Sequence, residues 1–152
     1  MAGMIGYMIT WTTYGSWLQG DERGYIKDGR ILKGNMALET SNIANLKTTA
    51  VELGPQQRQI IRDAILNKAE ALGQEIYALA VCTNHVHIVC ERISESIEIV
   101  MSRYKNATRL SLQANGFVGR VWTRGFDKRF CFTQRELENR IRYIRAHDER
   151  NG

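Results

Sequence analysis

The hydrophobic positions of the chain follow strand periodicity in some segments and helix periodicity in others. The segment MIGYMITWTTYG, at residues 4–15, is rich in β-branched and aromatic residues and predicts a strand. Apolar residues then recur at helical spacing from Ile60 to Leu72. Pro55 precedes this stripe as a helix-starting residue, and Gly73 follows it as a helix-ending residue. The first two regular elements are therefore predicted to be a strand and a long helix.

The next segment, EIYALAVCTNHVHIVCE at residues 75–91, is apolar with a polar dipeptide near its middle. That dipeptide, Thr83–Asn84, is typical of a tight turn, so the segment predicts the two strands of a hairpin. An apolar stripe from Ile97 to Thr108 then predicts a second amphipathic helix. Ser94 is the expected N-cap of this helix, and Asn115–Gly116 is its expected end.

The last third of the chain predicts one short strand and one helix. KRFCFT, at residues 128–133, has the alternating character of a strand. A helix is predicted from Thr133, because Thr133 and Glu136 have the spacing of a capping box. Leu137, Ile141 and Ile144 form the stripe that is expected to pack on the rest of the protein.

The predicted element order is β-α-β-β-α-β followed by a helix, which is the order of a ferredoxin-like split. We therefore expect an α+β fold in which helices pack on one face of an antiparallel sheet and leave the other face for a ligand. The chain, residues 1–152, is predicted to be a single domain in which residues 20–54 form a hairpin or loop excursion.

The composition is that of an ordinary globular protein, with 43% hydrophobic and 24% charged residues. No segment approaches the roughly 18 consecutive apolar residues of a membrane span, and the N-terminal segment lacks the features of a signal peptide. We therefore expect a cytoplasmic protein that does not enter a membrane. The three cysteines form no CxxC motif and are expected to be buried free thiols.

The positive charge is concentrated in the last third of the chain. Residues 1–102 carry 9 Lys/Arg and 11 Asp/Glu, a net charge of −2, whereas residues 103–152 carry 12 and 5, a net charge of +7. A polyanionic partner accounts for this asymmetry. A solvated helical face accounts for it equally well.

Two of the three histidines, His85 and His87, lie one residue apart in the second strand of the predicted hairpin. Because side chains alternate between the faces of a strand, both point to one side, and Val86 and Ile88 point to the other, into the core. Two imidazoles about 7 Å apart on one strand face can share a metal ion or contact one phosphate. The alternative is a pair of half-exposed polar residues on the solvent face of a sheet.

The third histidine, His147, follows Tyr143 by four residues in the last predicted helix, so the two side chains lie on one helix face. If this helix crosses the open face of the sheet, His147 completes a three-histidine metal site beside the phenol. A divalent ion there would polarise a phosphodiester for attack by the phenol. The alternatives are a surface tyrosine and a cationic histidine favoured by the C-terminal end of the helix dipole.

These motifs resemble those of a known enzyme family. TNHVHIV, with its histidine–hydrophobe–histidine sequence, resembles the HUH motif, and RIRYIRAHDE resembles the single-tyrosine motif of HUH transposases. ITWTTYGSWLQGDERG and VWTRGFDKRFCFTQRELENRIRYIR resemble segments of the REP-associated tyrosine transposases and their insertion-sequence-200-like relatives. The resemblance spans residues 5–148 and agrees with the predicted element order.

The resemblance implies a transposase that binds hairpin-bearing single-stranded DNA and cleaves it with a tyrosine. Cleavage by such enzymes leaves a 5′-phosphotyrosine link and a free 3′-OH, and rejoining reverses this reaction. By position, Tyr143 corresponds to the nucleophile, and His85 and His87 correspond to ligands of a divalent ion, Mg²⁺ or Mn²⁺. His147 corresponds to the third ligand. Relatives often have Gln or Asn there, so the histidine favours an ion softer than Mg²⁺.

The basic last third is expected to contact DNA, through cations on the phosphates and aromatic rings on unpaired bases. Core packing is the alternative for the aromatic residues, Trp122 and Phe126. Insertion-sequence relatives are homodimers and REP-associated relatives are monomers, so both states stay open. A non-catalytic nucleic-acid-binding protein and a nuclease that uses metal-bound water also stay open. The DNA-binding candidates are Arg120, Trp122, Arg124, Lys128, Arg129 and Arg140.

Overall fold

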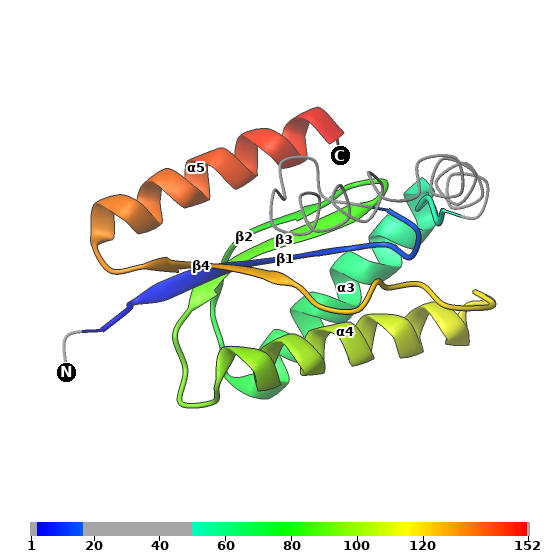
Figure 1. The fold of residues 1–152 in the computed structure, drawn as a ribbon, viewed down its shortest axis with the longest axis horizontal. Coiled ribbons are helices and arrows are strands. Elements are labelled where there is room, and N and C mark those ends of the chain that lie inside the picture. Colours follow the sequence, from blue (N-terminus) through cyan, green and yellow to red (C-terminus); the bar gives the residue numbers. More distant parts are fainter. Residues whose placement is uncertain (1–2, 17–49, 152) are drawn as a thin grey trace, which may run out of the picture.

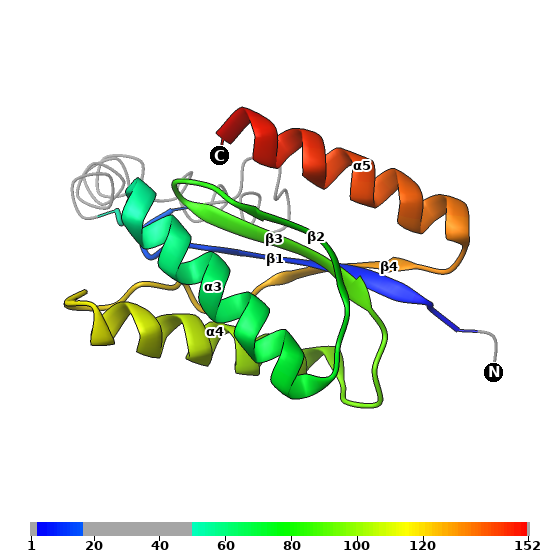
Figure 2. The same ribbon diagram turned by 180° about the vertical axis from the view of Figure 1, so that it is seen from behind.

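Four strands and three helices make up the part of the chain that the computed structural model describes, residues 3–16 and 50–151, with side chains described to residue 148. Figures 1 and 2 show a single sheet with helices on both of its faces. In chain order the elements are β1 (Gly6–Thr12), α3 (Pro55–Leu72), β2 (Ile76–Val81), β3 (His85–Glu91), α4 (Ile97–Ala114), β4 (Asp127–Cys131) and α5 (Gln134–Asn151).

The sheet is antiparallel throughout, and its strand order is β2-β3-β1-β4. The two central strands, β3 and β1, pair from Gly6 opposite Glu91 to Thr12 opposite His85. The expected α+β, ferredoxin-like arrangement is thus confirmed, and the histidine pair lies on a central strand.

The sheet separates two apolar clusters. Helices α3 and α4 cover one face, here called the α4 face, where Val86 and Ile88 are fully buried. Helix α5 covers part of the opposite face, here called the α5 face, mainly over β2 (Figure 1). Leu137 and Ile144 anchor α5 there, as the stripe of apolar residues predicts. The position of α5 decides what the histidines on this face can meet.

Two tyrosines expected in the core are indeed structural. Tyr104 of α4 donates a 2.5 Å hydrogen bond to Oε1 of Gln74, whose Nε2 donates to the hydroxyl of Tyr7 at 2.9 Å. All three side chains are buried on the α4 face. Burial raises the pKa of both phenols, so neither is suited to act as a nucleophile.

The helix ends follow the sequence signals with one exception. The N-cap of α4 is Ser96, whose Oγ accepts from the amide of Ile99 at 3.2 Å, and the assignment of Ser94 was wrong. Both serines precede the apolar stripe, and the backbone turns into the helix at the later one. Thr133 and Glu136 form the predicted capping box of α5.

Some sequence expectations fall on residues beyond this account. Of the predicted excursion at residues 20–54, residues 50–54 alone are described, and Leu53 among them is buried. In the described ranges, no helix combines the length and the apolar character that a membrane crossing requires.

The capping box of α5 gives a test of how firmly this helix is held. Replacing Thr133 with alanine removes the acceptor of the Glu136 amide and is expected to lower the free energy of unfolding by about 1 kcal/mol. Thr133→Ser keeps the hydroxyl and should stay close to the wild type. Urea unfolding followed by circular dichroism measures both variants. Equal stabilities for the alanine and serine variants would show that the box does not hold the helix.

Candidate active site

All three histidines of the chain meet between β3 and α5. The ring centroids are 4.8 Å apart for His85 and His87, 5.1 Å for His85 and His147, and 5.0 Å for His87 and His147. The Nε2 atoms of His85 and His147 are 2.9 Å apart, a hydrogen-bond distance. Helix α5 therefore passes over the face of the sheet on which both imidazoles of β3 lie.

Neighbouring polar groups fix the orientation of the two strand histidines. Oδ1 of Asn84 lies 2.7 Å from Nδ1 of His85, and because this oxygen can only accept, Nδ1 carries the proton. The lone pair of His85 is then on Nε2, directed at His147. Oγ1 of Thr10 shares a 2.8 Å hydrogen bond with Nδ1 of His87, leaving Nε2 of that ring for the site. Such outer contacts are typical of histidines that bind metals.

Both strand histidines stay neutral at physiological pH. Burial, with a smaller effect of His147, lowers the pKa of His85 from 6.5 to about 4. Burial, with smaller effects of His85 and His147, lowers the pKa of His87 to about 3. A neutral imidazole keeps the lone pair that a metal ion needs, so the chemistry of this donor set fits a divalent cation.

A fourth side chain, that of Cys82, belongs to this cluster and was not predicted from the sequence. The possible ligand atoms of Cys82, His85 and His147 all lie within 4.8 Å of one another. The predicted turn at Thr83–Asn84 contained the signal, because residues that flank a two-residue turn face each other across a hairpin. Cys82 indeed donates its amide hydrogen to the carbonyl of His85 at 2.9 Å. Thr10 and Asn84 had no comparable signal in the sequence.

Tyr143 lies one helical turn before His147, with its ring stacked parallel to the imidazole. The planes differ by 10°, and the centroids are 6.1 Å apart. Tyr143 is 54% exposed, in contrast to the buried His87. On the other flank of α5, Arg145 donates to the carbonyl of Tyr77 on β2 at 3.3 Å. Tyr143 and His147 therefore occupy the flank turned toward β3 and the part of the sheet that α5 leaves uncovered.

The C-terminal half of α5 is tied to the rest of the molecule by an ion pair. Nη2 of Arg62 on α3 lies 2.8 Å from Oδ1 of Asp148, and both side chains are about three-quarters buried, with 26% and 27% exposed. This contact links α3 to α5, which lie on opposite faces of the sheet. His147 is the residue next to Asp148, so the ion pair holds the histidine in place over β3.

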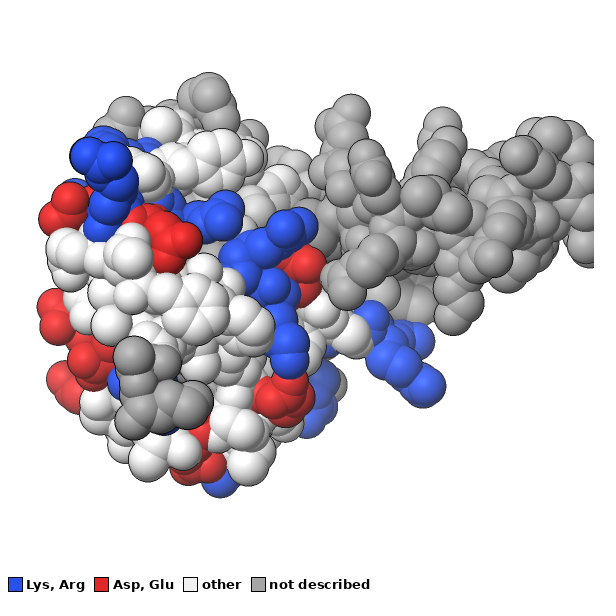
Figure 3. All heavy atoms as spheres, turned by 60° about the vertical axis from the view of Figure 1, so that its left-hand side comes forward, with Lys and Arg blue, Asp and Glu red and all other residues white. Residues whose placement is uncertain are grey.

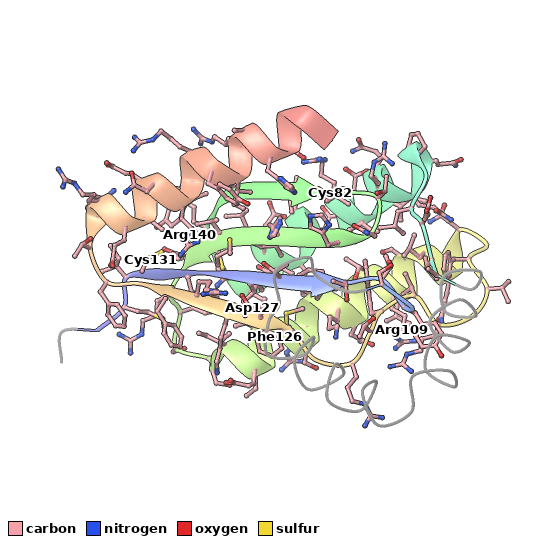
Figure 4. All side chains as sticks on the ribbon, turned by 45° about the horizontal axis from the view of Figure 1, so that its top comes forward. Cys82, Arg109, Phe126, Asp127, Cys131 and Arg140 are labelled. Carbon is pink, nitrogen blue, oxygen red and sulfur yellow. The ribbon has the colours of Figure 1, made fainter. Side chains whose placement is uncertain are left out.

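The predicted DNA-binding residues separate into two groups on opposite faces. Lys128 extends to the α4 face, where it contacts Glu98 at 2.5 Å. Arg129 pairs in register with Met8 of the α5 face, and its Nε lies 3.0 Å from Oδ2 of Asp127. The side chain of Arg140, a residue of α5, lies beside Cys131 of β4 (Figure 4). At the end of the molecule where β4 leads into α5, Figure 3 shows basic and acidic side chains interspersed.

A groove of about 520 Å³ lies between α4 and the segment that leads into β4. Its cations are Arg120 and Arg124, which the sequence singled out, and Lys105 and Arg109, which it did not. Lys105 donates to the carbonyls of Thr123 at 2.7 Å and Gly125 at 2.9 Å. Burial and the charge of Arg120 lower the pKa of Lys105. The groove thus gathers four basic side chains on the α4 face.

Trp122 packs in the core rather than presenting a free ring. It is 6% exposed, stacks edge-to-face on Trp11 with centroids 5.6 Å apart, and donates from Nε1 to Thr108 at 3.0 Å. This corrects the expectation that its indole stacks on a base. Phe126 is half-buried against the same cluster. Core packing, the alternative left open for both residues, describes them better.

Comparisons with known proteins give a likeness of fold. No protein-family model and no curated protein matches the chain. Among solved structures, a REP-associated tyrosine transposase bound to a REP hairpin is similar, with a TM-score of 0.57 and 15% identity over 95% of this chain and 67% of that one. A candidate transposase from Deinococcus radiodurans R1 has a TM-score of 0.47 and 16% identity over 94% of this chain and 90% of that one, too distant to add weight.

The depressed pKa values predict an acid-sensitive fold in the absence of metal. Between pH 6.5 and about 4, His85 and His87 bind protons in the unfolded chain but not in the folded site. The free energy of unfolding should therefore fall as the pH falls. His87 alone accounts for up to about 2 kcal/mol between pH 7 and pH 5. Urea unfolding in a chelator, compared with His87→Asn, measures this contribution. If the free energy of unfolding depends on pH equally in the two proteins, this contribution of His87 is contradicted.

The fold similarity and the motifs in the sequence lead to the same group of proteins. The family that TNHVHIV and RIRYIRAHDE resemble is the family of the structure with the TM-score of 0.57. At 15% identity the likeness establishes a shared architecture. This chain therefore has the fold of a tyrosine transposase, with a histidine cluster and a tyrosine gathered on the α5 face.

Proposed function

We propose that the protein is a metal-dependent DNA transposase that cleaves and rejoins single-stranded DNA through a 5′-phosphotyrosine intermediate at hairpin-bearing ends. The observation that carries the proposal is the meeting of His147 with His85 at 2.9 Å, one helical turn from Tyr143. A single chain supplies all of these groups. The fold it shares with a hairpin-bound transposase supports hairpin DNA as the substrate.

His85, His87 and His147 would hold the divalent ion. Once bound, the ion supplies positive charge that polarises the scissile phosphate and stabilises the charge that develops on its oxygens. The donors are neutral nitrogens, which suit Mn²⁺ better than the oxygen-preferring Mg²⁺. Asn84 and Thr10 keep the two strand imidazoles in the orientation that binding requires.

Tyr143 supplies the nucleophile in this mechanism. Its phenol loses a proton to solvent, and the oxygen forms a bond to phosphorus while the bond from phosphorus to the 3′ oxygen breaks. The leaving 3′ oxygen takes up a proton and becomes a free hydroxyl, and the 5′ side stays linked to the tyrosine. Exposure of the ring leaves it accessible to a strand that lies over the uncovered part of the sheet. Rejoining is the reverse reaction.

The groove on the α4 face is the candidate contact for the hairpin. Lys105 and Arg109 of α4 line it together with Arg120 and Arg124 of the facing segment, and these cations outnumber its one acidic residue, Glu98, which favours a polyanion. The segment is joined to β1 by the bridge between Thr13 and Trp122, and the neighbouring Thr12 pairs with His85. DNA that contacts both the groove and the histidines would pass the C-terminal end of β1.

Tyr143→Phe tests the nucleophile. Removal of one oxygen should abolish the covalent protein–DNA band that forms with hairpin-bearing single-stranded DNA and Mn²⁺. Binding of the same DNA, measured by gel shift, should persist. Cleavage that continues in Tyr143→Phe would favour attack by metal-bound water. If the wild type forms no covalent band with Mn²⁺ or Mg²⁺, a non-catalytic binding protein becomes the better interpretation.

Arg109→Ala and Arg124→Ala test the groove. Each should weaken DNA binding and reduce the slope of log affinity against log salt by about 0.7–0.9, the contribution of one phosphate contact. Arg142→Ala, which removes an exposed arginine from α5, is the control for net charge. Equal salt slopes for the three variants would exclude the groove as a DNA contact.

A further inference from the structure

We propose that Cys82 is a ligand of the bound metal, and that with His85 and His147 it forms a site selective for a thiophilic dication of the zinc type. The inference rests on the proposed metal site and specifies the ion that this site prefers. It concerns a side chain that has no part in the phosphotyrosine chemistry described above.

The backbone holds Cys82 in register with the histidines. It is the residue after β2, it is directly opposite His85 in the hairpin, and its side chain is 1% exposed within the apolar cluster under α5. Figure 4 shows it where the hairpin turns, below the C-terminal half of α5. The same alternation that directs His85 to the α5 face directs the thiol there.

The distances suit a shared ion. The ligand atoms of Cys82, His85 and His147 lie within 4.8 Å of one another, and the two Nε2 atoms are 2.9 Å apart. Bond lengths of about 2.3 Å to sulfur and about 2.0 Å to nitrogen place tetrahedral ligand atoms about 3.5 Å apart. Adjustments of about 1 Å therefore bring the three groups around one ion. The fourth position stays available to His87 or to a phosphate oxygen.

The donor set determines which ion is preferred. One sulfur and imidazole nitrogens favour Zn²⁺ or Co²⁺, whereas Mg²⁺ prefers oxygen ligands. The nearby carboxylate, Asp148, is engaged by Arg62 at 2.8 Å. Burial, with a smaller effect of the Asp148 charge, raises the pKa of the Cys82 thiol to about 11, and the charges of Arg58 and Arg62 oppose this. The dication replaces the thiol proton, which leaves to solvent.

Cobalt substitution tests this assignment without DNA. The purified wild-type protein, freed of metal and titrated with Co²⁺, should show the near-ultraviolet charge-transfer band of a thiolate–cobalt bond. Cys82→Ser should lose this band and bind Zn²⁺ at least about 10-fold more weakly in competition with a chelator. Cys131→Ala is the matched control and should keep both properties. Cys131 is also 1% exposed and lies in the same apolar cluster, on β4.

A positive test covers the case in which Cys82→Ser does not fold. In the double variant Cys90→Ala/Cys131→Ala the remaining thiol is Cys82, and the band should be retained. Absence of the band from the wild type, or its persistence in folded Cys82→Ser, overturns the proposal. Failure of the transposase proposal is distinguishable: a band in a protein that forms no DNA adduct leaves the Cys82 site standing. An adduct formed with Mg²⁺ by a protein that shows no band would support the transposase proposal and overturn the Cys82 site.

Discussion

The contact between α5 and the hairpin β2–β3 is the interaction on which the candidate site depends. Ile144 and Leu137 bury the apolar stripe of α5 against the sheet, and the Arg62–Asp148 ion pair ties its C-terminal half to α3. These contacts bring His147 to His85. If α5 were displaced, β3 would carry two imidazoles without His147, and Tyr143 would no longer lie beside the histidines.

Burial differs between the histidines of β3 and Tyr143. His85 and His87 are largely buried, so they stay neutral and keep their lone pairs, and the cost of their desolvation is offset by the hydrogen bonds that they form with Asn84 and Thr10. Tyr143 is largely exposed on the flank of the same helix. Under the proposed mechanism, this difference would leave the phenol accessible to a DNA strand while the two β3 imidazoles keep their lone pairs for a metal ion.

Much of the fold could be predicted because its signals are local. Alternation placed His85 and His87 on one face, and the spacing of Leu137, Ile141 and Ile144 identified the buried side of α5. The start of α4 was misassigned, since Ser94 and Ser96 are chemically equal caps and the turn of the backbone decides between them. The burial of Trp122 could not be read from the sequence either. Its partners Trp11 and Thr108 are brought together by the sheet and α4, far apart in the chain.

The separation of the basic groove from the histidines constrains how any DNA substrate could be handled. The groove is on the α4 face and the histidines are on the α5 face, so the sheet itself lies between them. One hydrogen-bonded connection runs through the end of β1, where Thr12 pairs with His85 and the next residue, Thr13, bridges to Trp122. The buried indole of Trp122 thus has a structural use near the DNA-binding candidates: it fixes the segment bearing Arg120 and Arg124 to the strand that flanks the histidine cluster. If DNA binds in the groove as proposed, this connection sets the position of the groove relative to the histidines.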